Sequence, residues 1–173
     1  MAKEMEYSKP IGKMAIVIGG SMAGLLAARI LAERYREVLI LERDACPTEA
    51  QPRKGVPQGQ HAHAVLARGQ QILEELFPGL MQHLFELGAV RGHGRFFSGG
   101  GYFYPVRRGP GGLYVSRPLL ETEVRARVLA LPNVRLRERC NVQGLIGGEI
   151  NNDEINNDEI RKNNNVYGVR VVN

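Results

Sequence analysis

A turn rich in small residues carries the side chains and backbone most suited to bind a ligand. Gly19, Gly20 and Gly24 lie in this turn, directly after an apolar run over residues 14–18. The run is rich in β-branched residues, which is typical of a strand buried in a parallel sheet. Residues 25–35, rich in Ala and Leu, are predicted to form a helix. The first N–H groups of such a helix are unpaired and its N-terminal end is electropositive, so the turn is suited to a phosphate group.

A carboxylate after the next apolar run extends this pattern. Residues 38–41 predict a second strand, and Glu42 follows it. Glu42 lies about 20 residues beyond the turn, the spacing at which a carboxylate accepts hydrogen bonds from a ribose hydroxyl. The common dinucleotide pattern is G-x-G-x-x-G, and Ser21 replaces its middle glycine. Serine is small and its hydroxyl can donate to a phosphate, so the order of elements predicts dinucleotide binding. The alternative is a plain βαβ unit without a ligand.

The composition is that of an α/β protein with a core of its own. The chain has 173 residues and a formal net charge of +5. Its arginines are scattered and no basic motif is interleaved with aromatic residues, so nucleic-acid binding is not expected. No apolar run approaches the roughly 20 residues that a membrane-spanning helix needs. Cys46 and Cys140 are far apart and lack metal-ligand spacing, which indicates free thiols, and a cytoplasmic location is expected.

The remaining segments alternate between helical patterns and irregular stretches. Residues 45–59 are dense in Pro and Gly and predict a long loop, and residues 91–115 predict irregular strands. Helices are predicted over residues 61–77, over residues 80–87 and from Pro118 onward. The expected buried positions are Val65, Gly69, Ile72, Leu73 and Leu76 in the first helix and Leu120, Val124, Val128 and Leu131 in the last. Glu121/Arg125 and Glu123/Arg127 form i,i+4 pairs, each worth a few tenths of a kcal/mol.

The C-terminal region contains a polar repeat between two strand patterns. Residues 149–160 repeat the letters NNDEI, and the Asn-rich tract continues to residue 165. Residues 134–145 and 166–172 have strand-like patterns. Because Asn, Asp and Glu dominate the repeat, it offers no face to a core, and residues 149–165 are interpreted as a low-complexity expansion of a turn.

Three segments together carry a family resemblance. They are the strand–GGSMAG–helix–LERD unit, the loop PRKGVPQGQHAH and the helix start SRPLLETEVRARV. They resemble the N-terminal part of FAD-dependent monooxygenases of the para-hydroxybenzoate hydroxylase type. The bacterial hydroxylase-like branch is closest, and it is also similar to squalene epoxidases and flavin-dependent halogenases. The resemblance covers residues 14–148 and 166–172. It implies a Rossmann-like α/β fold with a parallel sheet and antiparallel β-ribbon elements. Residues 14–173 would form one FAD- or NAD(P)-binding domain, and residues 1–13 would be a polar leader.

The resemblance also implies roles for individual residues. The turn residues that would wrap the FAD pyrophosphate are Gly19, Gly20, Ser21, Met22, Ala23 and Gly24. Glu42 would bind the adenosine ribose and Arg43 would lie on the adenine side. Arg53 would cross the ribityl chain, and Arg117 would contact the phosphate or ribityl region. The alternatives are a solvated strand end for Glu42, surface or loop charges for Arg43 and Arg53, and a helix-flanking charge for Arg117. His61 and His63, expected on a helix, are interpreted as satisfied or surface histidines.

The implied activity is that of an FAD-dependent monooxygenase that hydroxylates or epoxidises a small organic substrate, with NAD(P)H as reductant. The flavin performs the oxygen chemistry, so no catalytic side chain and no metal site is assigned. The later Gly-Asp motif of the family is absent from the sequence. The chain is therefore expected to be an N-terminal portion, with a second polypeptide as a possible source of the remainder. The alternatives are a non-catalytic or partner-dependent FAD-binding fragment and an NAD(P)-binding Rossmann protein.

Overall fold

The computed structural model describes residues 10–61, 63–92, 97–102, 111–147 and 166–172. The chain forms two compact units. The first comprises Met1–Cys46 and Leu129–Asn173, and the second comprises Pro47–Val128. The Asn-rich insertion and residues 1–9 of the predicted polar leader lie outside the described residues. Residues 10–13 of the predicted leader are described, and the first strand begins at Gly12 rather than at the predicted Met14.

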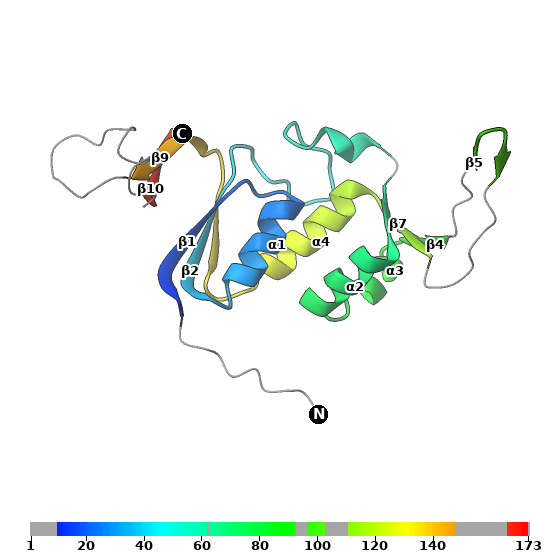
Figure 1. Cartoon of the computed structure of the whole chain (residues 1–173), viewed down its shortest axis with the longest axis horizontal. Helices are drawn as coiled ribbons and strands as arrows, with labels where there is room; N and C mark the ends of the chain where they lie inside the picture. The colour runs from blue at the N-terminus through cyan, green and yellow to red at the C-terminus, as the bar shows by residue number, and fades with distance from the viewer. Residues whose placement is uncertain (1–9, 62, 93–96, 103–110, 148–165, 173) are drawn as a thin grey trace, which may run out of the picture. The chain divides into compact units, whose positions relative to one another are not determined.

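A parallel three-stranded sheet forms the centre of the first unit. Its strands are β1 (Gly12–Ile18), β2 (Tyr35–Leu41) and β8 (Val134–Arg137), in the order β1-β2-β8. Helix α1 (Met22–Leu31) connects β1 to β2 and packs against both strands (Figure 1). Its Leu25 and Ala28 are fully buried, as are Val38 and Ile40 of β2. This βαβ arrangement confirms the predicted Rossmann-like α/β fold class.

Helix α1 differs in its bounds from the predicted helix over residues 25–35. It begins at Met22, and Tyr35 belongs to β2, where it pairs with Gly12. The amide of Asn133 donates to the carbonyl oxygens of Ala32 at 2.8 Å and Tyr35 at 3.0 Å. These bonds from a distant segment hold the chain between helix and strand, which the helix propensity of residues 32–35 could not reveal.

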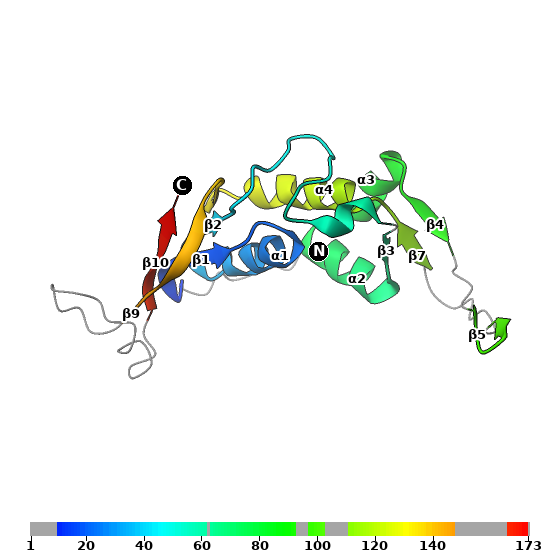
Figure 2. The same cartoon turned by 90° about the horizontal axis from the view of Figure 1, so that it is seen from above.

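An antiparallel pair of strands completes the described part of the first unit. Strand β9 (Asn141–Gly147) pairs with β10 (Val166–Val172), and Figure 2 shows the two side by side. The predicted strands before and after the Asn-rich tract are confirmed, and the region over residues 134–145 divides into β8 and the start of β9.

Deletion of residues 151–160 is expected to leave the melting temperature within about 2 °C of the unmodified chain. Asn, Asp and Glu dominate this tract, so it offers little apolar surface to bury, and its loss is expected to cost less than about 0.5 kcal/mol. Strands β9 and β10 pair on either side of this tract. Thermal unfolding of the deletion variant checks the expectation. A fall of many degrees would show that the repeat packs against the folded protein.

The second unit contains a small antiparallel sheet and several helices. The sheet has the order β3 (Ala64–Val65), β7 (Gly112–Tyr114) and β4 (Val90–Gly92). The helices are α2 (Ala67–Leu76), α3 (Leu80–Glu86) and α4 (Arg117–Leu129, whose last residue is grouped with the first unit), with a 3-10 turn η1 (Pro57–Gln60). Strands β5 (Phe97–Ser98) and β6 (Gly101–Tyr102) form a separate hairpin.

The helix predictions for this unit are confirmed in part. The helix predicted over residues 61–77 begins only at Ala67, because residues 64–65 pair with β7 instead. Its buried positions are Gln70 and Leu73, whereas Ile72 is 37% exposed, so part of the predicted apolar stripe is wrong. Helix α3 lies between Gly79 and Gly88, as predicted, and both glycines have positive φ. Of the buried positions predicted for the last helix, Leu120, Val124 and Val128 are confirmed. Leu131 lies beyond the helix end at Leu129 and is half-buried, so the prediction is wrong at that position.

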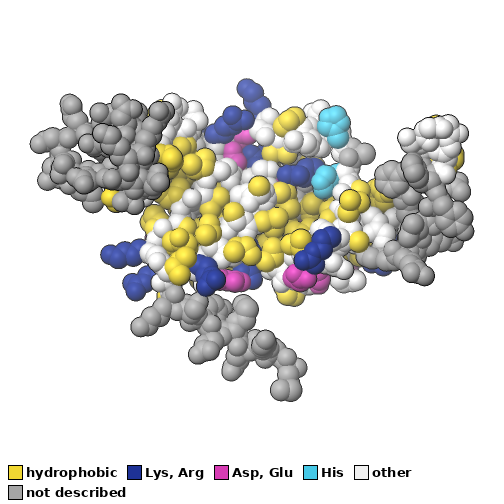
Figure 3. Space-filling view, viewed as in Figure 1, with side chains coloured by type: hydrophobic (Ala, Val, Ile, Leu, Met, Phe, Trp, Pro, Cys, Tyr) yellow, Lys and Arg dark blue, Asp and Glu magenta, His cyan; other side chains and the backbone are white. Residues whose placement is uncertain are grey.

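Charged side chains on the described surface lie in several groups. In Figure 3 the dark-blue Lys and Arg side chains form several separate groups on the visible face, and magenta acidic side chains lie beside some of these groups. Among the described residues, Arg29 and Glu33 form an ion pair at 2.6 Å, and Arg127 and Glu123 form one at 2.9 Å. Within the described ranges, no helix has the length and apolar character that crossing a bilayer requires.

Candidate functional site

The glycine turn lies where β1 ends beside the end of β2. The Gly19 N–H donates to the Leu41 carbonyl oxygen at 2.8 Å, and Gly19 has φ +98°. A Cβ atom on Gly24 would lie 1.8 Å from the Gly19 carbonyl oxygen, so the helix approaches the turn as only glycine allows. A Cβ on Gly19 would meet nothing within 4 Å in the described structure. The turn is therefore tightly packed at Gly24 and open at Gly19.

The N-terminus of α1 follows directly from this turn. Ser21 is the N-cap residue, and its side chain makes no capping hydrogen bond. The first turn of the helix has no acidic residue; Met22 is half-buried and Ala23 is exposed. No carboxylate of the first turn therefore binds the backbone N–H groups or neutralises the positive end of the helix dipole. This arrangement fits a phosphate group.

Glu42 connects the two strand ends through its carboxylate. Its Oε2 accepts the Gly20 N–H at 2.7 Å, and its Oε1 accepts the Asp44 N–H at 3.0 Å. The residue is only 6% exposed, so Glu42 is not the solvated strand end of the alternative interpretation. Each oxygen of this carboxylate therefore accepts a backbone N–H group. The structure thus brings together two residues of the predicted site, Gly20 and Glu42.

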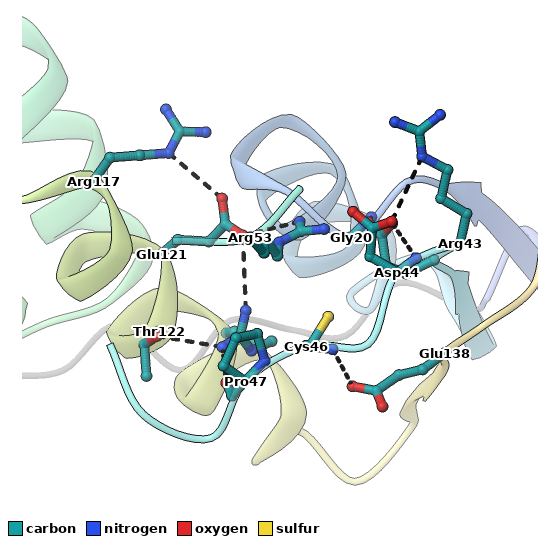
Figure 4. Close-up of polar contacts among 12 residues, drawn as sticks. Gly20, Arg43, Asp44, Cys46, Pro47, Arg53, Arg117, Glu121, Thr122 and Glu138 are labelled. Carbon is teal, nitrogen blue, oxygen red and sulfur yellow. Dashed lines mark hydrogen bonds and ion pairs between the residues drawn. The ribbon is translucent and has the colours of Figure 1, made fainter. Parts of the chain in front are cut away.

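Arg43 lies in a different environment from Glu42. Its side chain is 66% exposed, and its Nε lies 3.8 Å from Asp44 Oδ1 (Figure 4). The following segment is tied to the connection between β8 and β9, because the Cys46 N–H donates to Glu138 at 3.0 Å. An adenine contact of Arg43 stays a prediction.

In the second unit, three arginines surround one carboxylate. Glu121 Oε1 accepts Arg53 Nε at 2.9 Å and lies 2.9 Å from Arg53 Nη2. Its Oε2 lies 3.4 Å from Arg117 Nε (Figure 4), and its Oε1 lies 3.7 Å from Arg125 Nη1. The side chains of Glu121 and Arg53 are 5% and 7% exposed. The structure therefore brings Arg53 and Arg117 together through a residue that the sequence analysis did not assign to the site.

The cluster changes the interpretation of both arginines. Arg53 is buried in an ion pair, so it is not merely a solvated loop charge. Arg117 is the first residue of α4, where a cation opposes the helix dipole, and Glu121 one turn later is an anionic partner within the chain. The sequence pattern predicted the Glu121/Arg125 pair but did not indicate that both side chains are buried. The i+4 spacing from Arg117 was the signal that could have indicated this second contact.

A cavity of about 450 Å³ lies beside Arg53 in the second unit. Its described lining residues are Pro52, Arg53, Lys54, Val56, Pro57, Gln60 and His61. Two of these carry a positive charge and none of them is a carboxylate. The cavity is therefore suited to an anionic group rather than to a cation.

The two histidines of the loop do not lie on a helix, contrary to the prediction. His61 is exposed and follows η1, and His63 is half-buried. Nδ1 of His63 is buried and has no hydrogen-bond partner among the described residues, so the expectation of a satisfied histidine is wrong at this atom. Burial, and secondarily the positive charge of Arg117, lower the pKa of His63 below its usual 6.5, while a backbone hydrogen bond with Val115 opposes the shift.

A His63→Gln variant is expected to lose less stability on acidification than the unmodified chain. Because the pKa of His63 is lowered in the folded state, the unfolded chain takes up the proton first as the pH falls below about 6.5. Stability is therefore lost with falling pH in this window, and removal of the imidazole removes that contribution. Melting temperatures between pH 7.5 and pH 5 check this, with His61→Gln as the exposed control. Equal losses in the two variants would contradict the assignment.

The described residues contain no group of three or more His, Cys, Asp and Glu side chains placed to hold a metal ion. Cys46 is half-buried and Cys140 is buried, and no disulfide joins them in the described structure.

Comparison with known proteins shows a similarity in sequence to a mycobacterial protein. No protein-family model matches the chain. Protein Rv3254 of Mycobacterium tuberculosis (strain ATCC 25618 / H37Rv) is 38% identical to it over 133 residues, which are 72% of this chain and 28% of that protein. The chain thus spans less than a third of the length of this relative.

Solved structures match the chain at lower sequence identity. The p-nitrophenol 4-monooxygenase PnpA from Pseudomonas putida DLL-E4 has a TM-score of 0.58 and 19% identity, over 81% of this chain and 35% of that chain. The myxobacterial chondrochloren halogenase CndH, a variant of FAD-dependent halogenases, has a TM-score of 0.63 and 22% identity, over 95% of this chain and 34% of that chain. The chain shares the fold of these enzymes. The match extends over about a third of their length.

Proposed function

We propose that this chain binds FAD as the dinucleotide-binding portion of a flavin-dependent oxidoreductase. The observation that carries the proposal is the bond from the Gly20 N–H to the buried Glu42 carboxylate. This bond holds a buried carboxylate beside a turn of small residues and the N-terminus of α1, at the ends of two neighbouring parallel strands. This is where open α/β sheets bind dinucleotides. The shared fold with an FAD-dependent halogenase supports FAD as the dinucleotide.

The proposed roles follow from the chemistry of each group. The turn residues that would hold the diphosphate are Gly19, Gly20, Ser21, Met22, Ala23 and Gly24. Glu42 would accept hydrogen bonds from the adenosine ribose. Arg53 and Arg117 would bind the phosphate or ribityl part, and Arg43 would lie near the adenine.

The reaction that we propose is a monooxygenation, the hydroxylation or epoxidation of a small organic molecule with NAD(P)H as reductant. The shared fold with the monooxygenase PnpA supports it. When bound, FAD would supply the redox chemistry, including the activation of O₂. The contribution of this chain would be to bind and orient the cofactor and to exclude water. No acid–base pair or metal is needed for that contribution. We further propose that the active site is of the para-hydroxybenzoate hydroxylase type.

We also propose that turnover requires polypeptide in addition to these 173 residues. The matched lengths support this, since the chain covers 28% of Rv3254 and 35% of PnpA. In that case the additional polypeptide would supply the remaining surfaces of the substrate site.

The absorption spectrum of the purified chain, with and without added FAD, tests the proposal. Flavin bands that persist through gel filtration are expected. A parallel titration with NADH distinguishes the NAD(P)-binding alternative, which predicts NADH binding and no retained flavin. A colourless chain that ignores added FAD would contradict FAD binding by this chain alone.

A further inference from the structure

We propose that Glu121 is a positioning residue, which orients the guanidinium groups of Arg53 and Arg117 toward a phosphate-type group of the bound dinucleotide. The inference rests on the proposed FAD binding and adds to it a residue with no assigned role. Arg53 comes from the long loop and Arg117 begins α4, so they are 64 residues apart in the sequence. Their common described contact is the carboxylate of Glu121.

The contacts of Glu121 fix the direction of both guanidinium groups. Glu121 lies one turn into α4, and its carboxylate is almost fully buried. Each arginine turns its Nε toward the carboxylate, at 2.9 Å for Arg53 and 3.4 Å for Arg117. A guanidinium is planar, so contact along the Nε edge sets the plane of the group. In Figure 4 the terminal nitrogens of Arg117 point away from Glu121.

Arg125, the third cation of the cluster, makes its shortest contacts with groups other than Glu121. Its Nη2 donates to the Pro47 carbonyl oxygen at 2.5 Å and to Thr122 Oγ1 at 3.3 Å. Its Nη1 is the most distant of the guanidinium nitrogens around Glu121, at 3.7 Å. Arg125 therefore ties the start of the loop to α4, and the oriented pair consists of Arg53 and Arg117.

The surroundings of Arg53 favour an anion as the ligand. The cavity of about 450 Å³ beside it is also lined by Lys54 and has no carboxylate among its described lining residues. Buried guanidinium groups are costly unless negative charge compensates them. Phosphate oxygens match the bidentate geometry of arginine, so a phosphate-type group is the fitting ligand.

The test measures FAD affinity in the full chain after Glu121→Asp. Glu121→Gln is unsuitable because loss of the buried countercharge would destabilise the fold. The shorter Asp keeps the charge but cannot hold both arginines, so the Kd for FAD is expected to rise about tenfold. Glu123→Gln is the matched control on the same helix, since Glu123 pairs with Arg127 and is more exposed. It is expected to leave the Kd within about twofold.

Repeating the Glu121→Asp substitution in a chain that already carries Arg117→Met separates positioning from a merely structural role. If Glu121 acts through Arg117, the effect of Glu121→Asp on the Kd is expected to fall below about threefold in an Arg117→Met chain. An equal factor in both backgrounds, or an unchanged Kd in Glu121→Asp itself, would overturn the inference while leaving FAD binding intact. Melting temperatures without FAD verify that each variant is folded. An unsubstituted chain that does not bind FAD would contradict the proposed function and this inference with it.

Discussion

A Gly24→Val variant is expected to lose FAD binding, with a Kd at least about 100-fold higher than that of the unmodified chain. The reason is the contact between the helix and the turn. The first side-chain carbon would lie 1.8 Å from the Gly19 carbonyl oxygen and 2.9 Å from the Gly19 carbonyl carbon. Both are backbone atoms, so relief requires movement of the turn itself. Fluorescence titration with FAD measures the loss.

Gly19→Val is expected to weaken FAD binding by a different route. Its Cβ lies in open space, so the substitution causes no direct clash. Instead, φ +98° is unfavourable for valine and costs about 1–3 kcal/mol, and the side chain would occupy the open side of the turn where a phosphate would approach. The same backbone strain occurs elsewhere in the chain, which allows a matched control.

Gly88→Val is that control. Gly88 also has φ +98° with nothing within 4 Å of its added Cβ, and it lies in the turn after α3. This variant is expected to lower the melting temperature about as much as Gly19→Val but to leave the Kd for FAD unchanged. Equal loss of FAD binding in the two variants would mean that general destabilisation, rather than the ligand site, explains the effect.

The βαβ unit could be predicted from the sequence because its signals are local. The apolar runs of β1 and β2 and the glycines between them lie within one short stretch, and neighbouring residues decide each element. The start of α2 could not be predicted in this way. Pairing of residues 64–65 with β7, almost 50 positions later, overrides the helical pattern of the segment before Ala67.

The two polar contacts of the candidate site, Glu42 with Gly20 and Glu121 with Arg53, could not be predicted from the sequence either. The spacing of Glu42 predicted a ribose ligand, but its bond to the Gly20 N–H depends on how the strand ends meet. Similarly, Glu121 was assigned only an i,i+4 pair with Arg125, since its contact with Arg53 spans 68 residues. Sequence spacing identified the residue types of the site, whereas burial and long-range contacts decide which of them act together.

Glu42→Gln is expected both to lower stability and to weaken FAD binding. The carboxylate is buried and accepts two backbone N–H groups, from Gly20 and Asp44. An amide has only one acceptor oxygen, so one N–H would face an NH₂ group. A buried donor left without its acceptor costs about 1–3 kcal/mol, which corresponds to a fall of roughly 3–10 °C in melting temperature for a chain of this size.

Glu138→Gln is the control for this effect. Glu138 also accepts a backbone N–H, that of Cys46 at 3.0 Å, but it is exposed to solvent. Water can replace the lost bond there, so a change below about 0.5 kcal/mol is expected. Similar losses in the two variants would contradict the view that burial makes the Glu42 bonds important.

The ligand dependence of Glu42→Gln separates its proposed contact with the ribose from its structural role. FMN lacks the adenosine half of FAD, so a ribose contact can affect FAD but not FMN. We expect the Kd for FAD to rise about tenfold, as for loss of a hydrogen bond to a charged group, with little change for FMN. If both flavins are weakened equally, Glu42 acts by holding the turn at Gly20. If neither is weakened, the ribose assignment is wrong, because the buried carboxylate then stabilises the strand ends without contributing to binding.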